Sequence, residues 1–226
     1  GKPRLLAGRV HPGFPMMDAA LRAAVIHDRL RPLFPDPQPA LDHQNAYELL
    51  VATVLAAQCT DARVNTVTPE FFRRWPAPAA LARAGVDEVE AVVHPTGFFR
   101  QKAKNLVAAA KILVERHDGR IPATMAELTA LPGVARKTAN IVLSNALGIN
   151  VGIAVDTHVR RLSYRLGLTT SENPVIIEKD LMPLFAPEAY GEINHLLVLF
   201  GREVCKARRP RCGDCVLNDV CPKRGV

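Results

Sequence analysis

The stretch LTALPGVARKTANIVLSNALGINVGIAVDTH, residues 128–158, contains the pattern that indicates the fold and the function of the chain. A tight turn, Leu131-Pro132-Gly133-Val134-Ala135, separates a short helical pattern ending near Ala130 from a second helix over about Arg136–Leu147. The turn leaves the first N–H groups of the second helix without helical partners, beside a glycine that has no side chain. Such an N-terminus attracts anions through its unpaired donors and the positive end of the helix dipole. We therefore predict an anion-binding turn between two short helices.

Two reactive side chains follow this turn in the sequence. Lys137 lies in the first turn of the second helix, and a single acid, Asp156, follows an apolar run. A lysine attacks carbon only as the neutral amine, so its ordinary pKa near 10.4 must fall or its proton must be removed. The helix N-terminus and Arg136 both disfavour the ammonium form. Asp156 could accept a proton or stabilise a developing cation, although aspartate is also a common helix N-cap.

The composition favours helices, because aromatic residues make up only 5% and β-branched runs are few. Residues 149–155 alternate weakly, but no partner strand is evident, so we expect an extended connector there. The fold class that we predict is all-α. Besides the pair around the turn, helical patterns cover residues 17–30, 45–59, 60–75, 79–83, 87–93, 101–117, 156–166, 174–184 and 189–204.

The charge points to a polyanionic partner. The formal net charge is +7, and residues 199–226 hold seven Lys or Arg against three acids, a local excess of +4. The longest nearly unbroken apolar run, Leu49–Ala57, is too short to span a bilayer. We therefore expect a cytoplasmic, nucleoid-associated protein with no membrane partner.

Four of the five cysteines lie close together near the end of the chain. Cys205, Cys212, Cys215 and Cys221 have the spacing C-x6-C-x2-C-x5-C, which in a chain without secretory features indicates a metal site rather than disulfides. The uneven loops suit a [4Fe–4S] cubane, but the spacing alone leaves zinc open. Cys59, on an apolar helix, is expected to be a small buried hydrophobe.

The first loop of this tail is strongly basic. It carries four cations, and a cluster that fixed it would present them to phosphates. The alternative is an ordinary solvated charge run. The cations are Lys206, Arg208, Arg209 and Arg211.

The segment LPGVARKTAN, the segment VDTH and the cysteine tail together resemble the endonuclease III family of DNA glycosylases with lyase activity. The resemblance covers nearly the whole chain from about residue 40. It implies that the four tail cysteines ligate a [4Fe–4S] cluster. It also implies a six-helix barrel over 39–149 with a helix–hairpin–helix at about 123–147. A discontinuous cluster domain over 1–38 and 150–226 would complete the fold, with DNA in the cleft between the two.

The resemblance also implies an activity, the removal of oxidised pyrimidines from duplex DNA in base excision repair. Lys137 would attack C1′ of the sugar, Asp156 would assist, and β-elimination from the resulting Schiff base would cut the strand there or at an abasic site. Relatives that act on adenine or mismatched thymine carry another residue at the lysine position, so Lys137 favours a bifunctional enzyme. The alternatives are a monofunctional glycosylase and a non-catalytic DNA-binding module. We expect a monomer.

Further residues are assigned to DNA by the same resemblance. Gln58 would fill the space left by an extruded base, and Phe98 or Phe99 would intercalate from the other side. His158 is expected to order the local backbone. The hairpin would bind phosphate through Gly133, Ala135 and Arg136.

The hairpin departs from the family pattern at one position. The family usually has Gly-Val-Gly, whereas this chain has Gly133-Val134-Ala135. If the third position required a positive φ or close approach of a phosphate, alanine would be unfavourable there. We therefore expect Ala135→Gly to leave DNA affinity unchanged or to tighten it.

Overall fold

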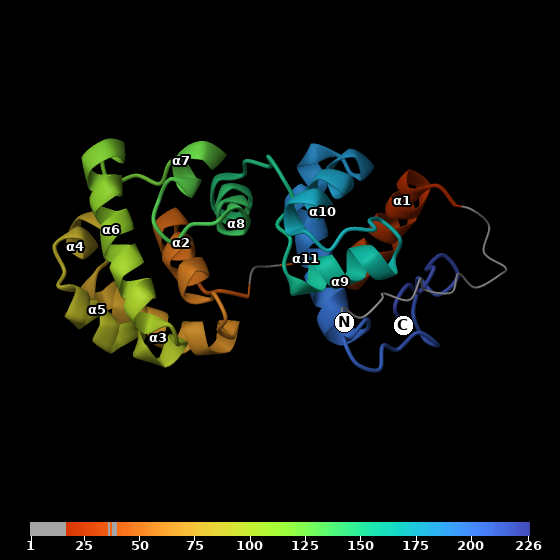
Figure 1. Ribbon diagram of the computed structural model, residues 1–226, viewed down its shortest axis with the longest axis horizontal. Coiled ribbons are helices and arrows are strands. Elements are labelled where there is room, and N and C mark those ends of the chain that lie inside the picture. Colours follow the sequence, from red (N-terminus) through yellow and green to blue (C-terminus); the bar gives the residue numbers. More distant parts are fainter. Residues whose placement is uncertain (1–16, 36, 38–39) are drawn as a thin grey trace, which may run out of the picture. The chain divides into compact units, whose positions relative to one another are not determined.

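The computed structural model describes residues 17–35, 37 and 40–226, and within them every regular element is helical (Figure 1). This confirms the all-α class. The chain forms two compact units, which we call the central unit, Gln38–Val151, and the discontinuous unit, residues up to Pro37 together with Gly152–Val226. Among the described residues, no helix is both long enough and apolar enough to cross a membrane.

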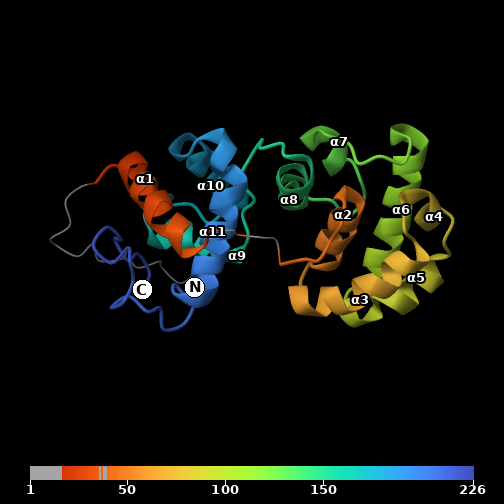
Figure 2. The same ribbon diagram turned by 180° about the vertical axis from the view of Figure 1, so that it is seen from behind.

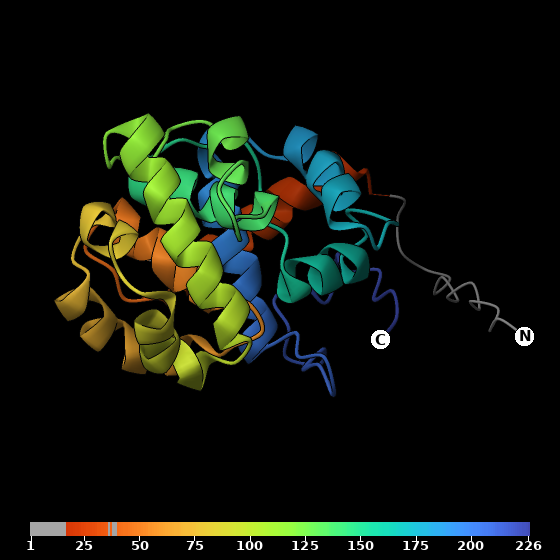
Figure 3. The same cartoon turned by 60° about the vertical axis from the view of Figure 1, so that its left-hand side comes forward.

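The central unit is built around one largely apolar helix, α2 (Ala46–Leu55), in which Tyr47 and every residue from Leu49 to Leu55 are buried. Helix α6 (Phe99–His117) packs against it and crosses in front of it in Figure 3, while α8 (Arg136–Leu147) contacts it as well (Figure 2). The remaining helices of the unit are α3 (Asp61–Arg74), α4 (Pro78–Ala82), α5 (Val86–Val93), the 3-10 turn η2 (His94–Thr96) and α7 (Met125–Thr129).

Side-chain caps explain where several of these helices begin. Asn45 accepts the N–H of Glu48 at the start of α2, and Thr60 accepts the N–H of Arg63 at the start of α3. The predicted end of α2 near Cys59 is wrong, because the helix stops at Leu55. Turn bonds over Val54–Ala57 and a left-handed backbone at Gln58 (φ 53°) replace its last turn.

The discontinuous unit joins one helix from before the central unit to three from after it. They are α1 (Ala19–Leu30), α9 (Thr157–Arg165), α10 (Pro174–Leu181) and α11 (Tyr190–Glu203), with 3-10 turns η1 (Arg31–Leu33), η3 (Met182–Leu184) and η4 (Pro187–Ala189). Their buried faces form a second apolar core, separate from that of the central unit. Residues 149–155 form no strand, as expected for a connector, and the tail after Val204 is irregular.

Candidate functional site

The predicted turn between α7 and α8 is present, and three apolar side chains anchor it. Leu128, Leu131 and Val134 are buried in the core of the central unit. Between them the N–H of Val134 donates to the carbonyl of Leu131, and Gly133 adopts a left-handed φ of 80°. The sequence therefore folds into a tight hairpin with its apolar residues inside and the glycine exposed.

The N-terminus of α8 is open to solvent. Ala135 is the N-cap residue and provides no side-chain cap, and Arg136 and Lys137 follow it as exposed residues of the first turn. The φ of Ala135 is −88°, in the extended region. The hairpin therefore needs no positive φ at this position, and alanine fits the observed backbone.

Gly133, in contrast, cannot be replaced without strain. A Cβ built there would lie 2.9 Å from Nδ2 and 3.0 Å from Cβ of Asn105, a residue of α6. We expect Gly133→Ala to destabilise the fold by about 1–3 kcal/mol, because both the left-handed φ and this contact are unfavourable. Urea unfolding measures the loss, and DNA affinity should fall with it.

Ala135→Gly provides the matched control for this prediction. It replaces alanine by glycine two residues further along the hairpin, where φ is extended. The free energy of unfolding should therefore fall by less than about 1 kcal/mol. DNA affinity should stay unchanged or tighten. Equal losses in the two variants would show that the left-handed turn at Gly133 is not what the hairpin requires.

Gln58 and Phe98 lie in two exposed loops of the central unit, and each has a left-handed backbone, with φ of 53° and 47°. Phe98 is 66% exposed, more than any other large hydrophobic side chain in the described part of the chain. Phe99 instead packs partly against the core and near the ring of His94. Non-glycine residues held in the left-handed region often occur at functional positions. The structure therefore distinguishes Phe98 from Phe99 as the side chain presented to solvent.

Asp156 is the N-cap of α9, as its position before Thr-His-Val indicated. Its Oδ1 accepts the N–H of Val159 at 2.8 Å. His158 accepts a hydrogen bond from Arg161 at Nδ1, because a guanidinium only donates. Burial lowers the pKa of His158, while the charge of Asp156 acts in the opposite direction. The start of α9 thus holds a half-buried carboxylate in a fixed position beside an imidazole.

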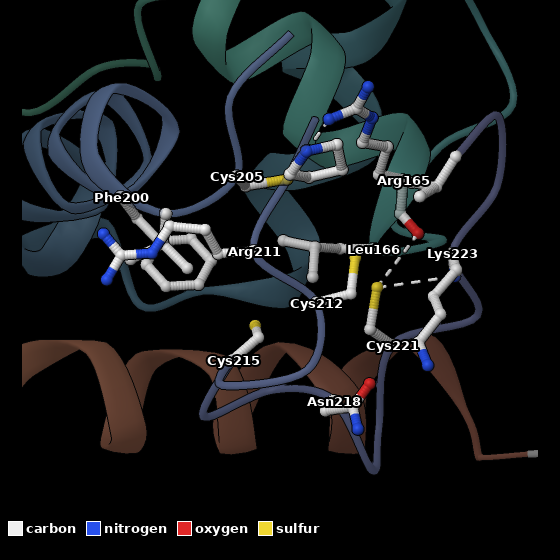
Figure 4. Close-up of a pocket in the computed structure, with 13 residues that line it drawn as sticks. Arg165, Leu166, Phe200, Cys205, Arg211, Cys212, Cys215, Asn218, Cys221 and Lys223 are labelled. Carbon is white, nitrogen blue, oxygen red and sulfur yellow. Dashed lines mark hydrogen bonds between the residues drawn. The ribbon is translucent and has the colours of Figure 1, made fainter. Parts of the chain in front are cut away.

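The four tail cysteines surround one space in the discontinuous unit. Figure 4 shows their sulfur atoms facing a common pocket, which is also lined by Leu166 and Phe200 and by the polar side chains of Arg165 and Lys223. Among residues 17–35, 37 and 40–226, no three His, Cys, Asp or Glu side chains are arranged to hold a single metal ion. Four cysteine sulfurs around one pocket would provide one ligand for each iron of a cubane.

The surroundings of these sulfurs suit a bound cluster. The backbone N–H groups of Leu217 and Lys223 donate to the sulfurs of Cys215 and Cys221 at 3.4 Å, and hydrogen bonds to sulfur are typical of iron–sulfur sites. Burial raises the pKa of the Cys221 thiol to about 11. A cluster would offset that burial, because bound iron stabilises thiolate. The residues present therefore fit the group.

Two arginines of α9 hold the basic loop, which we define as residues 205–211. The guanidinium of Arg165 is largely buried and donates to the carbonyls of Lys206 and Ala207 at 2.7 and 3.0 Å, and to the sulfur of Cys205. Arg161 donates to the carbonyls of Cys205 and Gly201. Sequence reasoning missed both arginines, although their spacing of four places them on one face of the helix.

The same loop is closed at its base by the N–H of Arg211, which donates to the carbonyl of Val204. Its charged side chains remain exposed, whereas its backbone is tied to α9. The backbone of the loop is therefore fixed, and phosphate binding by its exposed side chains stays a prediction. The exposed cations are those predicted, Lys206, Arg208, Arg209 and Arg211.

Comparison with known proteins gives two family matches. Residues 51–187 match the HhH-GPD superfamily of base excision DNA repair proteins. Residues 205–221 match the iron–sulfur binding domain of endonuclease III. This second match begins and ends on the first and last tail cysteines, and it decides between iron–sulfur and zinc in favour of the [4Fe–4S] cluster.

Individual relatives agree along nearly the whole chain. Endonuclease III of Synechocystis sp. is 51% identical over 89% of this chain and 92% of its own length. Endonuclease III of Escherichia coli K12 is 39% identical over 91% of this chain and 96% of its own length. Relatives of this similarity and coverage share one fold.

Solved structures give the same result. A trapped endonuclease III–DNA covalent intermediate matches with a TM-score of 0.85 and 39% identity, covering 91% of this chain and 96% of that chain. A thermostable thymine-DNA glycosylase matches with a TM-score of 0.78 at 21% identity, covering 90% of this chain and 94% of that chain, which shows the shared fold alone. The hairpin, the four-cysteine cavity and these matches lead to one conclusion: the chain belongs to the endonuclease III family of base excision DNA repair proteins.

Proposed function

We propose that this protein is a bifunctional DNA glycosylase and AP lyase that removes oxidised pyrimidines from duplex DNA and then cuts the strand. The observation that carries the proposal is Lys137, an exposed residue in the first turn of a helix without a side-chain cap, four residues after the hairpin glycine Gly133. A phosphate held at that N-terminus would bring the neighbouring sugar to the amine. The covalent DNA intermediate of the related endonuclease III supports a covalent route.

In the proposed reaction the neutral amine of Lys137 bonds to C1′ of the sugar as the bond from C1′ to the base breaks. The base leaves with that electron pair and takes up a proton. The amine then loses a proton, its lone pair breaks the C1′–O4′ bond, and O4′ takes up a proton, which leaves a protonated Schiff base between Nζ and C1′. The Schiff base acidifies C2′, a base (water or a carboxylate) accepts the C2′ proton, and the electron pair of that C–H bond forms the C2′–C3′ double bond as the 3′ phosphate leaves. Water then releases the lysine.

Asp156 serves this reaction as a fixed carboxylate. One of its oxygens is held by the N–H of Val159, so the side chain needs no reorganisation when charge develops. It takes the proton from the attacking amine or stabilises the cationic sugar as the base departs. The N-cap and the catalytic role are therefore compatible, and the cap positions the acid.

DNA binding in the proposal uses both units. The hairpin residues Gly133, Ala135 and Arg136 bind a phosphate, and Gln58 and Phe98 fill the space that the extruded base leaves. Cys205, Cys212, Cys215 and Cys221 would hold the cluster and in this way fix the basic loop, which contacts further phosphates. The protein acts as a monomer at the bacterial nucleoid.

The basic loop gives a quantitative prediction. Each phosphate contact lowers the slope of log affinity against log salt by about 0.9. Arg208→Ala combined with Arg209→Ala should therefore make the salt slope shallower by about 2 and weaken binding to all sequences alike. Binding titrations across salt concentrations measure this. Arg83→Ala, an exposed arginine of the central unit, is the control, and a matching change there would point to a general effect of net charge.

The activity is tested under single turnover on duplexes carrying thymine glycol, an abasic site or undamaged thymine. We expect strand breaks without alkali on the first two and none on the third. Base release with breaks only after alkali would mean a monofunctional glycosylase. Tight binding with neither product would mean a non-catalytic DNA-binding module.

A further inference from the structure

One buried lysine connects the two loops that carry Gln58 and Phe98. Lys102 lies in the first turns of α6 and is only 5% exposed. Its Nζ donates to the carbonyl of Leu55, the last residue of α2, at 2.8 Å. The same Nζ donates to the carbonyl of Thr96, the last residue of η2, also at 2.8 Å. Both hydrogen bonds are buried.

Each of these carbonyls lies just before one of the exposed side chains. Leu55 precedes Gln58 by three residues, and Thr96 precedes Phe98 by two. The backbone N–H of Lys102 also donates to the carbonyl of Phe98 at 3.1 Å. Lys102 therefore binds the Phe98 loop at two carbonyls, those of Thr96 and Phe98, and the segment before Gln58 at one, that of Leu55. The two left-handed residues, separated by 40 positions in sequence, share this single anchor.

Burying a lysine at this position is unfavourable unless its ammonium group is required for the hydrogen bonds that it makes. Burial lowers the pKa of Lys102, and the positive end of the α6 dipole disfavours a cation in the first turns. The side chain of Cys59 acts in the opposite direction on that pKa, and Lys102 takes part in no salt bridge among those of the described residues. Two carbonyl oxygens are then the main partners of a buried ammonium, and a shorter or apolar side chain would leave both oxygens without it.

We propose that Lys102 is a positioning residue for base extrusion: its ammonium sets the spacing of the Gln58 and Phe98 loops, so that both side chains enter the duplex together. The inference rests on the proposed role of Gln58 and Phe98. It assigns Lys102 no contact with DNA and no part in the chemistry of Lys137. Removing the ammonium should therefore impair extrusion of a paired base while leaving attack on an unpaired abasic sugar intact.

The test compares two substrates in the holoprotein. Lys102→Met should lower single-turnover excision of thymine glycol from a duplex by about tenfold or more. Schiff-base trapping on a single-stranded abasic site needs no extrusion and should change by less than about twofold. Lys102→Arg keeps a cation and several donors, so it should recover part of the duplex activity. Lys111→Met, an exposed lysine on the same helix, is the control for loss of charge.

A second readout follows the loops themselves. 2-Aminopurine placed opposite the lesion brightens when its stacking is disturbed, so its fluorescence on binding reports entry of the two side chains. Lys102→Met should lose most of that signal, as should Gln58→Ala and Phe98→Ala. Excision by Lys102→Met that is unchanged, or lowered equally on both substrates, would overturn the inference.

The outcomes separate this inference from the function on which it rests. If Gln58→Ala and Phe98→Ala both extrude the base as well as the wild type does, the proposed role of these side chains is wrong, independently of the result for Lys102→Met. If Lys102→Met does not fold, a double-mutant cycle with Gln58→Ala and Phe98→Ala tests the inference in protein that keeps Lys102. The cycle compares duplex excision by the two single variants and by the double variant. If the two loops share one anchor, the fold-loss in duplex excision by the double variant should be smaller than the product of the fold-losses of the two single variants. Multiplicative losses would overturn the inference.

Discussion

Replacing Lys137 by glutamine should abolish strand incision while leaving DNA binding largely intact. The variant keeps a polar side chain of similar reach at an exposed helix position, so neither the hairpin nor the core is disturbed. It removes the amine that forms the Schiff base in the proposed reaction. We expect single-turnover incision of an abasic duplex to fall by about 10³-fold or more.

The matched control is Lys111→Gln, which removes an exposed lysine from α6 at the same cost in net charge. It should retain wild-type incision and affinity. Retained incision in Lys137→Gln would assign the nucleophile to another amine. A collapse of binding in both variants would show that net charge, rather than the hairpin amine, governs the interaction.

Asp156→Asn should nearly eliminate base excision without destabilising the protein. Asparagine and aspartate cap helices almost equally well, so the hydrogen bond to the N–H of Val159 survives. The negative charge is lost, and with it the proton acceptor or cation stabiliser, which is expected to cost about 10²–10⁴-fold in the single-turnover rate. The free energy of unfolding, measured by thermal denaturation, should differ from that of the wild type by less than about 0.5 kcal/mol.

Asp156→Ala completes the comparison, because it removes the cap and the charge together. Its stability should fall by about 1 kcal/mol, while its rate should match that of Asp156→Asn. An Asn variant with wild-type excision and an unstable Ala variant would reduce Asp156 to a helix cap.

Local sequence signals predicted the elements that local chemistry controls. The Pro-Gly turn, the cap at Asn45 and the cap at Asp156 each depend on residues within one helical turn, and the structure contains all three. The end of α2 was misplaced because an apolar run continues through Ala57. No residue type in that run predicts the end of the helix at Leu55 or the left-handed backbone that follows at Gln58.

Contacts between distant residues could not be predicted in this way. The bond from Lys102 to Leu55 spans 47 positions, and that from Arg165 to Lys206 spans 41. A lysine or arginine in an amphipathic helix is usually a surface cation, so burial of either side chain is visible only after folding. The cysteine spacing likewise left zinc and iron–sulfur open, and the family match to residues 205–221 settled the group.

The most direct test of the account is to trap the Schiff base and locate it. The holoprotein is treated with borohydride on a duplex carrying an abasic site, and the reduced adduct is digested and mapped by mass spectrometry. We predict a single modified peptide that contains Lys137, and no adduct in Lys137→Gln. An adduct on the N-terminal amine, on Lys102 or on any other lysine would contradict the assignment of the nucleophile on which the proposed mechanism depends.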